Sequence, residues 1–549
     1  MTDRVRFDAV DIASFPRLNP LFRDYLKGSP ELGDFFRWDP RKPQDQIVAC
    51  LTRQSYPRDH VVTVLTDQNR AWGAHDVALQ GIARLRDPRA VTIVTGQQVG
   101  IFGGPLYTLY KALTAVALAR QVESQWQIPC LPLFWMDAED TDFAEIDHLS
   151  MPDHQDEVKL LRYAPPQGYG SDLPATHKLS STIGEVIAAL EQATGQAHSQ
   201  EHVLKLLRES YSPGATLVHA FARLLSTLLS DRGLILADPS DARFKALARP
   251  LFLRETDTAP VSARLVQTAS EKLRELGYRP QVKVRGEGPN LFYLDGEGRH
   301  PIKEGDHGVL RGGTRTWRNR EELALCVKEN PEHFSPNVVL RPVMESFLFP
   351  VLAHIGGPHE IAYYAQLRGV FDHFDIPMPL VLPRATLTLV EGRIERLLKK
   401  HNLTLPALQG GPERVVSRVL RASLPRTFVA KQQRILGSIL KHFQELKAMV
   451  SALDPTLAPR AGRAEGAVKK QMEALERDLL RSYKRRNQEL QTQVRRVQTH
   501  LLPGGQLQER VYGFMPYLCR HGLSLIELIM ASIDGPGRDH RILYLGASR

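Results

Sequence analysis

The stretch from residue 90 to 111, AVTIVTGQQVGIFGGPLYTLYK, decides the fold. Residues 90–94 form a short apolar run rich in β-branched side chains, which predicts a buried strand. A glycine-rich loop follows at 96–104, and Pro105 opens an apolar segment, since proline is favourable at the first position of a helix. Strand, glycine-rich loop and helix in this order begin a βαβ unit, so the chain is predicted to be an α/β protein.

The sequence after this stretch continues the α/β pattern. Residues 128–135, IPCLPLFW, predict a second strand. An acidic loop at 136–142 follows at the strand's carboxyl end, where open α/β sheets bind their ligands. Further strands are predicted at 234–237, 281–284, 291–294 and 378–382, with a strand end at 337–342 and a helix over 360–374. The mixed segments between about 150 and 300 are interpreted as insertions into the core.

From about residue 386 the sequence becomes helical. Apolar residues spaced by threes and fours run through 435–453 and 468–501, with a loop between them at 454–464. Two such helices predict an antiparallel coiled-coil hairpin, and a narrow hairpin that exposes its flank favours a homodimer. The predicted organisation is a core with insertions at 1–385, a helical coiled-coil arm at 386–505, and a segment at 506–549 that returns to the core.

Length and composition limit the class of protein. A chain of 549 residues with 42% hydrophobic and 24% charged residues predicts a soluble globular protein of two or three domains. It shows neither a membrane-spanning apolar run nor a signal-peptide pattern, so we expect a cytoplasmic protein that does not bind a membrane. The four cysteines lack C-x-x-C spacing, which argues against a disulfide framework and a structural zinc site. A net charge of +10 suits either nucleic acid or small anionic substrates.

The glycine-rich segment is the first candidate site. Glycines let the backbone approach a ligand closely, and a helix N-terminus offers N–H groups to an anion. Lys111, about two turns into the predicted helix, is placed to reach back to a negative group. The same glycines would also serve a turn that only packs strand on helix, and the segment matches neither the P-loop nor G-x-G-x-x-G. The candidate ligand-binding residues are Thr95, Gly96, Gln97, Gln98, Gly103, Gly104 and Tyr107.

The acidic loop after the second strand is the second candidate site. Clustered carboxylates act as general bases, or they bind an ammonium group or Mg²⁺. Acids in the first turn also stabilise a helix, and Asp142, Glu145 and His148 would share one helix face at threefold spacing. Asp140 and Asp142 are the catalytic candidates together with Lys111, and Glu139 and His148 are candidate binding residues.

A third group of candidates follows residue 340. Arg341 suits bidentate binding of a carboxylate or phosphate, although a structural ion pair would account for it as well. His354 and His359 lack the H-E-x-x-H spacing of a zinc site, so they are given no role and no metal is predicted. The other candidate binding residues of this group are Gly356, Gly357, Tyr363, Gln366 and Arg384.

Several segments together resemble one family. They are VTIVTGQQVGIFGGPLYTLYKALTA (91–115), FWMDAEDTDFAEIDH (134–148), NLFYLD (290–295) and NVVLRPVMESFLFPVLAHIGGPHEIAYYAQLRGVFDHFDIPMPLVLPR (337–384), with FPRLNPLFRDYLKG (15–28) and LQERVYGFMPYL (507–518) near the two ends. In this order they are similar to the bacillithiol biosynthesis cysteine-adding enzymes, a family of cysteine ligases, over nearly the whole chain. The resemblance implies a Rossmann-like core similar to class I synthetases and nucleotidyltransferases, with connecting insertions, and a coiled coil that mediates homodimer formation.

The resemblance also implies a reaction. The carboxyl group of cysteine is joined to the amine of glucosaminyl-malate to give bacillithiol, and ATP is the expected activator of the carboxyl group. As a hypothesis for this reaction, the 96–104 loop and the following helix N-terminus bind the malate carboxylates or a phosphate, while Lys111 and Arg341 add positive charge. Asp140 or Asp142 then holds or deprotonates the amine.

The sequence departs from the family pattern at two places. Thr141 stands where a histidine is expected in the acidic loop. If that histidine acts as a base, Asp142 or His148 would have to replace it. His354 and His359 stand where no histidines are expected.

Three other interpretations stay open from the sequence. One is a related nucleotidyltransferase-like or synthetase-like enzyme with another amino-sugar acceptor. Another is a nucleic-acid-binding protein that uses the basic helix at 484–496, which ranks below an enzyme because aromatic residues for base stacking are missing there beyond Tyr483. The third is a scaffold that has kept the fold and lost the chemistry, which Thr141 leaves open.

Overall fold

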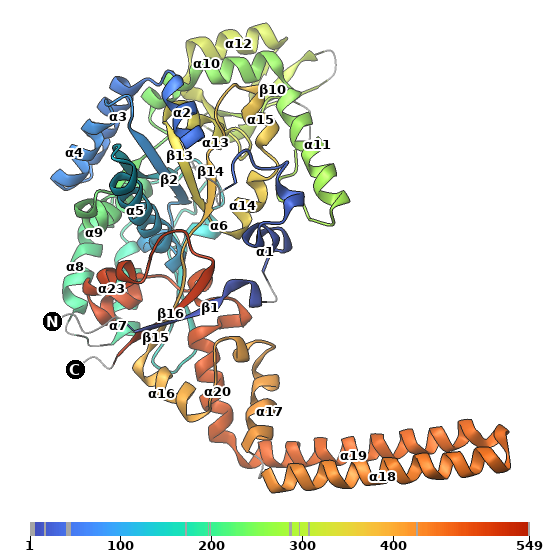
Figure 1. The fold of residues 1–549 in the computed structure, drawn as a ribbon. Helices are drawn as coiled ribbons and strands as arrows, with labels where there is room; N and C mark the ends of the chain where they lie inside the picture. The colour runs from blue at the N-terminus through green and yellow to red at the C-terminus, as the bar shows by residue number, and fades with distance from the viewer. Residues whose placement is uncertain are drawn as a thin grey trace. The chain divides into compact units, whose positions relative to one another are not determined.

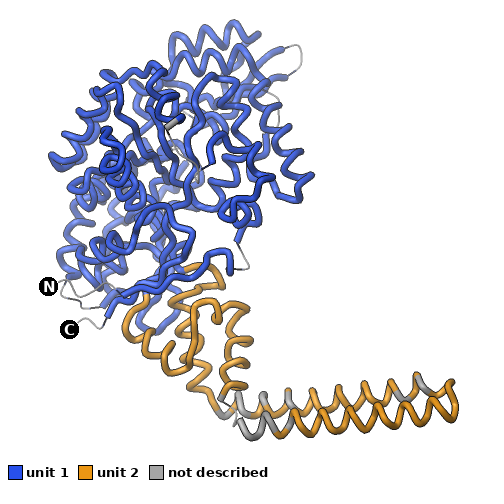
Figure 2. The backbone as a smooth tube through the Cα atoms, viewed as in Figure 1, with its two compact units in different colours: residues 1–389, 508–549 blue, residues 390–507 orange. Residues whose placement is uncertain are grey.

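The computed structural model describes residues 6–15, 18–39, 45–170, 173–195, 197, 199–284, 288–295, 297–305, 308–423 and 426–546. The chain divides into two compact units, coloured separately in Figure 2. The core unit comprises residues 1–389 and 508–549, and the helical unit comprises residues 390–507. The helical unit is therefore an insertion in the sequence of the core unit.

A five-stranded parallel sheet forms the centre of the core unit (Figure 1). Its strands, in spatial order, are β14 (Leu380–Pro383), β13 (Val351–Gly356), β2 (Val91–Gln98), β3 (Cys130–Asp137) and β6 (Ile235–Ala237). Along the chain, β2, β3 and β6 extend the sheet to one side, and β13 and β14 extend it to the other. The strand order thus reverses at β2, which confirms the predicted α/β, Rossmann-like core.

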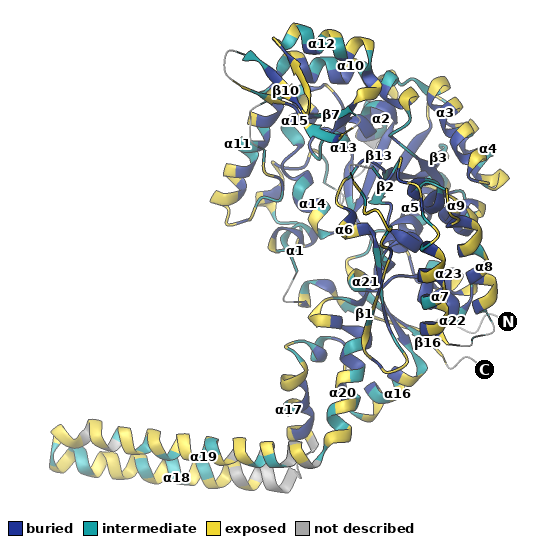
Figure 3. Cartoon of the chain, turned by 180° about the vertical axis from the view of Figure 1, so that it is seen from behind, coloured by how far each residue is buried: buried dark blue, intermediate teal, exposed yellow. Residues whose placement is uncertain are grey.

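The predicted strand–loop–helix stretch forms the middle of this sheet. Residues 91–95 of β2 are all buried, as a central strand with two covered faces requires (Figure 3). Helix α5 (Leu106–Trp126) begins directly after Pro105 and packs along β2 and β3. Helix α14 (Pro358–Tyr364) packs along β13 and β14. The element pattern read from residues 90–119 is therefore confirmed.

Two predicted strands are absent from the places assigned to them. Residues 281–284 form no strand, because the N–H groups of Gln281 and Val282 donate to Gln366 Oε1 instead of to another strand. Residues 337–342 form a turn and a helix start: Asn337 Oδ1 accepts the N–H group of Val339, and α13 (Arg341–Leu348) begins immediately afterwards. Side-chain acceptors override the strand preference of both segments, a distant one at 281–282 and a local one at 337–342.

Small antiparallel sheets surround the central one. Strand β16 (Asp539–Leu545) lies between β1 (Phe7–Asp11) and β15 (Thr386–Glu391), so the last part of the chain pairs with the first. The other sheet strands are β12 (Phe334–Pro336), β7 (Leu291–Asp295) and β8 (Gly298–Pro301); β11 (Arg315–Trp317), β10 (Leu310–Gly312) and β9 (Lys303–Glu304); and β4 (His148–Pro152) with β5 (Val158–Arg162). The predicted strand at 291–294 therefore exists outside the central sheet.

Further α-helices cover the core unit. They are α1 (Pro20–Lys27), α2 (Asp45–Arg53), α3 (Arg58–Ala71), α4 (Asp76–Arg84), α6 (Phe143–Ile146), α7 (Ile183–Thr194), α8 (Gln200–Ser210), α9 (Leu217–Leu229), α10 (Ala242–Thr258), α11 (Val261–Glu275), α12 (Arg320–Glu329), α15 (Arg368–His373), α21 (Gln508–Val511), α22 (Met515–His521) and α23 (Ser524–Ala531). The helix predicted over 360–374 is thus split between α14 and α15.

The helical unit contains a long hairpin. Its helices are α16 (Gly392–Lys400), α17 (Pro412–Ser423), α18 (Arg426–Leu453), α19 (Ala458–Arg486) and α20 (Gln488–Leu501), and α18 packs against α19. The coiled-coil hairpin is confirmed, with two corrections. The loop predicted at 454–464 shrinks to residues 454–457, and the helix predicted over 468–501 is interrupted at Asn487. Among the described residues, no helix combines the length and apolar character needed to cross a membrane.

Candidate active site

A cavity of about 410 Å³ lies at the carboxyl ends of β2, β3 and β13. This is the point where the strand order reverses, and the connections from β2 and β13 leave in opposite directions there. Its walls contain ten of the residues predicted from the sequence: Gly96, Gln97, Gln98, Tyr107, Lys111, Asp140, Arg341, Gly357, Tyr363 and Arg384. They also contain Trp135, Asp137, Glu145, Val338, Glu345, His354, Pro358, His359, Glu360 and Arg510.

The glycine-rich loop has two parts with different roles. Gly96 lines the cavity, and a Cβ atom at this position would lie 2.8 Å from the carbonyl oxygen of Trp135. Gly103 and Gly104 have φ angles of +85° and +76° and lie outside the cavity lining. A Cβ atom on Gly103 would overlap the Phe514 ring. These two glycines therefore shape the turn into α5, and their prediction as ligand-binding residues is not supported by their placement.

Thr95 and Gly356 also lie outside the lining. The Thr95 hydroxyl donates to the carbonyl oxygen of Ile355 at 2.9 Å and ties β2 to β13. The carbonyl oxygen of Gly356 accepts the N–H group of Arg384, which fixes the segment after β14. Both residues therefore stabilise the backbone next to the cavity without lining it.

Lys111 reaches back from α5 as predicted, but a protein carboxylate already meets it. The Lys111 side chain is only 3% exposed; its ammonium donates to Gly96 O and Gln97 Oε1, both at 2.8 Å, and pairs with Glu360 Oε2 at 2.8 Å. Burial lowers the pKa of Lys111, and the Glu360 carboxylate opposes that shift. The predicted free positive charge at Lys111 is therefore neutralised inside the wall.

Glu360 joins Lys111 to His354, which the sequence interpretation left without a role. Glu360 Oε2 accepts the N–H group of Gly357 at 2.7 Å. The buried His354 ring lies with Nε2 3.9 Å from Glu360 and Nδ1 3.4 Å from Glu345. Burial alone would lower the pKa of His354, but the two carboxylates outweigh it and raise the pKa. The sequence does contain a sign of the role of Glu360: it lies three residues after Gly357, the position from which a carboxylate side chain caps the start of a helix.

The two arginines predicted in the site are paired as well. Arg341, the first residue of α13, forms an ion pair with Asp137 at the end of β3. Burial raises the pKa of Asp137, and Arg341 opposes that shift. Arg384 pairs at 2.7 Å with Glu509, and both side chains are buried. Glu509 lies far away in the sequence, and no local pattern pointed to it.

Within the acidic loop, Asp140 alone of the predicted acids lines the cavity. Its carboxylate accepts from Gln98 Nε2 at 2.8 Å and from the N–H group of Asp142 at 3.2 Å. The side chains of Thr141 and Asp142 are exposed. Glu139 faces away from the cavity, where it pairs with Lys245 and accepts from the Ser335 hydroxyl.

Two more predictions for this region are corrected. Asp142, Glu145 and His148 do not share a helix face, because α6 is a single turn and His148 begins β4. His148 contacts Asp147, and Gln366 ties residues 281–282 to the core, so neither residue lines the cavity. Among the described residues, no cluster of three or more histidine, cysteine, aspartate or glutamate side chains is arranged to hold a metal ion.

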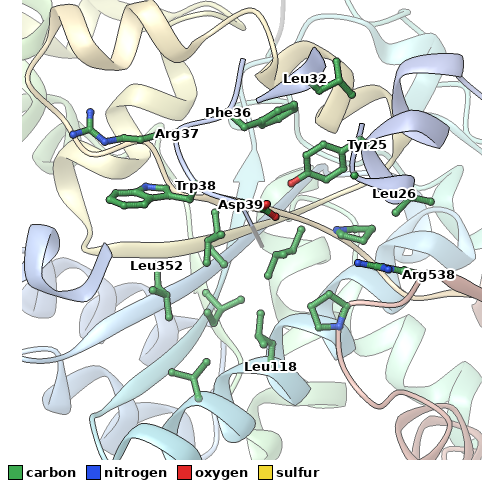
Figure 4. Close-up of a pocket in the computed structure, with 18 of the residues that line it drawn as sticks. Tyr25, Leu26, Leu32, Phe36, Arg37, Trp38, Asp39, Leu118, Leu352 and Arg538 are labelled. Atoms are coloured by element: carbon green, nitrogen blue, oxygen red, sulfur yellow. The ribbon is translucent and has the colours of Figure 1, made fainter. Parts of the chain in front are cut away.

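A larger cavity of about 880 Å³ lies elsewhere in the core unit. It is lined mainly by apolar side chains of α5, of β13 and β14, and of residues 25–39, with Trp38, Leu118 and Leu352 among them (Figure 4). The Trp38 indole donates to the carbonyl oxygen of Met378 and is therefore satisfied by the fold. None of the predicted site residues lines this cavity.

Comparison with known proteins matches both parts of the chain to one family. The model of the bacillithiol biosynthesis BshC N-terminal Rossmann-like domain matches residues 6–385, and that of the BshC C-terminal coiled-coil domain matches residues 387–545. Relatives named "Putative cysteine ligase BshC" include proteins of Salinibacter ruber (35% identical over 97% of both chains), Koribacter versatilis (33%, over 98% of this chain and 99% of the relative) and Geobacillus kaustophilus (32%, over 96% and 98%). Matches that span both domains at this identity show that the chain belongs to the BshC family of bacillithiol biosynthesis.

Proposed function

We propose that this protein is a cysteine ligase that joins the carboxyl group of L-cysteine to the amine of glucosaminyl-malate, the last step of bacillithiol formation. The name carried by its full-length relatives supports the ligase activity. The observation that carries the proposal in the structure is Asp140, a carboxylate in the cavity wall with no ion-pair partner among the described residues. We place the reaction in the cytoplasm, where cysteine is kept as a free thiol.

Asp140 has the chemistry that the acceptor amine requires. An amine attacks a carboxyl carbon only when it is neutral, so a base must take its proton. Gln98 and the N–H group of Asp142 fix the Asp140 carboxylate, while Asp137 is paired with Arg341 and Glu360 with Lys111. Asp140 is therefore the lining carboxylate that is held by hydrogen bonds and free of an ion-pair partner; in this proposal it holds the substrate ammonium and accepts its proton, and Asp142 acts only through its backbone.

Activation of the cysteine carboxyl group needs a co-substrate that takes up one oxygen, and ATP is the activator expected from the sequence. Three cations of the cavity wall, Lys111, Arg341 and Arg384, are each paired with a carboxylate, so these three do not favour a triphosphate there. We therefore assign no step of the reaction to ATP in this cavity.

A direct assay tests the function. The purified protein is incubated with cysteine and glucosaminyl-malate, with and without ATP, and bacillithiol is measured by mass spectrometry. We expect product that depends on both substrates. No product under any condition, together with an unchanged thiol profile and no accumulated glucosaminyl-malate in cells that lack the gene, would refute the cysteine-adding assignment.

We also propose that the protein is a homodimer formed through the α18–α19 hairpin. None of the described side chains of these two helices is buried, and several are large and apolar (Figure 3). Met449 is 65% exposed and Leu446 50%, with Ile435, Leu453 and Leu475 also exposed. A row of exposed apolar side chains on a two-helix hairpin is typical of a surface that packs on a partner.

A further inference from the structure

The charges of the cavity wall are almost completely paired. Lys111 pairs with Glu360, Arg341 with Asp137, and Arg384 with Glu509. His354 lies between Glu345 and Glu360, and His359 Nδ1 lies 3.1 Å from Gln281 Oε1. The wall could not attract a charged ligand through groups that already neutralise one another.

Arg510 is the exception on the positive side. It lies in α21, in the segment that returns from the helical unit, and it lines the cavity with an exposed side chain. Its guanidinium has neither a hydrogen bond nor an ion pair to any residue that the structure describes. Arginine offers a planar fork of donors that matches a carboxylate.

Asp140 and Glu145 are the matching exceptions on the negative side. Both carboxylates line the cavity, and neither has an ion-pair partner within the described ranges. Tyr107 lies near both sides: burial raises the pKa of its phenol, the charges of Arg510 and Arg384 oppose that shift, and the charges of Glu360 and Glu145 add to it. The unpaired cation and an unpaired acid thus act on the same phenol, to which Gln97 also donates.

We infer that Arg510 binds a carboxylate of the malyl group of the acceptor substrate, while Asp140 and Glu145 receive its amine. This inference rests on the proposed function. Unpaired charges of both signs in one cavity suit a ligand that carries an ammonium and a carboxylate. Glucosaminyl-malate is such a ligand, and its malyl carboxylates take no part in amide formation, so they are free for a permanent contact. Arg510 is then a residue that selects the malylated amino sugar over an unmodified one.

The test is a comparison of two acceptors in three variants of the full-length protein. Arg510→Gln removes the charge, Arg510→Lys keeps it without the planar fork, and Arg223→Gln removes an exposed arginine of α9 outside the cavity as the matched control. Binding of glucosaminyl-malate and of methyl glucosaminide, which lacks the malyl group, is measured by calorimetry. Thermal unfolding verifies that each variant is folded.

We expect Arg510→Gln to weaken glucosaminyl-malate binding about 10- to 100-fold, the range of a charge-assisted hydrogen bond. The affinity of Arg510→Lys for glucosaminyl-malate should lie between those of Arg510→Gln and the wild type, and that of Arg223→Gln should match the wild type. Binding of methyl glucosaminide should not change in any variant. In turnover, KM for the acceptor should rise while kcat and KM for cysteine stay near the wild type. Equal affinity of Arg510→Gln and wild type for glucosaminyl-malate would overturn the inference and leave the proposed function standing, as would a loss confined to cysteine. A wild-type protein that binds neither substrate would overturn both the inference about Arg510 and the proposed function.

Discussion

Asp140 and Asp142 are two residues apart and were equal candidates from the sequence, yet their side chains lie in different environments. Asp140 lines the cavity, and Asp142 is exposed to solvent. We predict that Asp140→Asn lowers kcat by about 10²- to 10⁴-fold, the usual contribution of a general base.

Asp142→Asn is the matched control, because it keeps the backbone N–H group that holds Asp140. Its turnover should stay within a few-fold of the wild type. Steady-state kinetics on both variants decides the matter, and a larger loss in Asp142→Asn would remove Asp140 from the role proposed for it.

His354 makes stability depend on pH. Its pKa is raised in the folded protein by Glu345 and Glu360, against the effect of burial. A raised pKa contributes stability that is complete below the unfolded-state value of about 6.5 and is lost as the pH rises through the folded-state pKa. We therefore predict that the difference in Tm between the wild type and His354→Gln is largest near pH 6 and shrinks toward pH 9. A difference that is constant or grows over this range would contradict the assigned protonation.

The candidate site was predictable where it follows from strand ends. Parallel strands bring their carboxyl ends together. The sequence therefore predicted Gln98 at the end of β2, Asp140 in the loop after β3 and Arg384 directly after β14. The sequence could not show which residue of the acidic loop faces the cavity. Glu139 turns toward Lys245 of α10, whereas the adjacent Asp140 lines the cavity. Arg510 was not predicted, because its position depends on a long-range return of the chain.

At the scale of elements, the turn between β2 and α5 depends on Gly103. Its φ of +85° is in the left-handed region, and a Cβ atom would overlap the Phe514 ring. We predict that Gly103→Ala lowers the free energy of unfolding by about 2–4 kcal/mol, from backbone strain and overpacking together. Gly184→Ala in α7 is the control, because no atom lies within 4 Å of the added Cβ and alanine favours a helix. Denaturant unfolding measures both, and equal stabilities would contradict the steric argument.

The elements themselves were predicted best where burial governs them. β2, β3 and β6 are buried apolar runs, and they stay in the sheet even though the Asn69 side chain accepts the N–H group of Leu236 in β6. The apolar residues within 337–342 resembled those of a buried strand. The Asn337 side chain instead accepts the N–H groups of the residues that follow and starts α13. Strand β1 was not predicted because its residues are mostly exposed, and its pairing partner β16 is more than 500 residues away.

At the scale of the whole molecule, the hairpin surface leads to a prediction about assembly. If two chains pack through α18 and α19, charges placed on the exposed apolar row should separate them. We predict that Leu446→Glu with Met449→Glu gives a monomer by light scattering after size exclusion, where the wild type gives a dimer. Far-UV circular dichroism controls for loss of helix. A wild-type monomer, or a dimer unaffected by the two charges, would show that the hairpin is not the interface.

The position of the helical unit within the sequence has a consequence for translation. A ribosome makes β15 and Arg384, then all of residues 390–507, and only afterwards Glu509 and β16. During that interval the nascent core contains Arg384 without its counter-ion Glu509. It also contains β1 and β15 without β16, the strand that lies between them in the finished sheet. Such an intermediate exposes an unpaired strand edge, which is the kind of surface that chaperones cover. A chain stalled within the hairpin would carry neither Glu509 nor Arg510, so an interrupted synthesis yields no finished cavity.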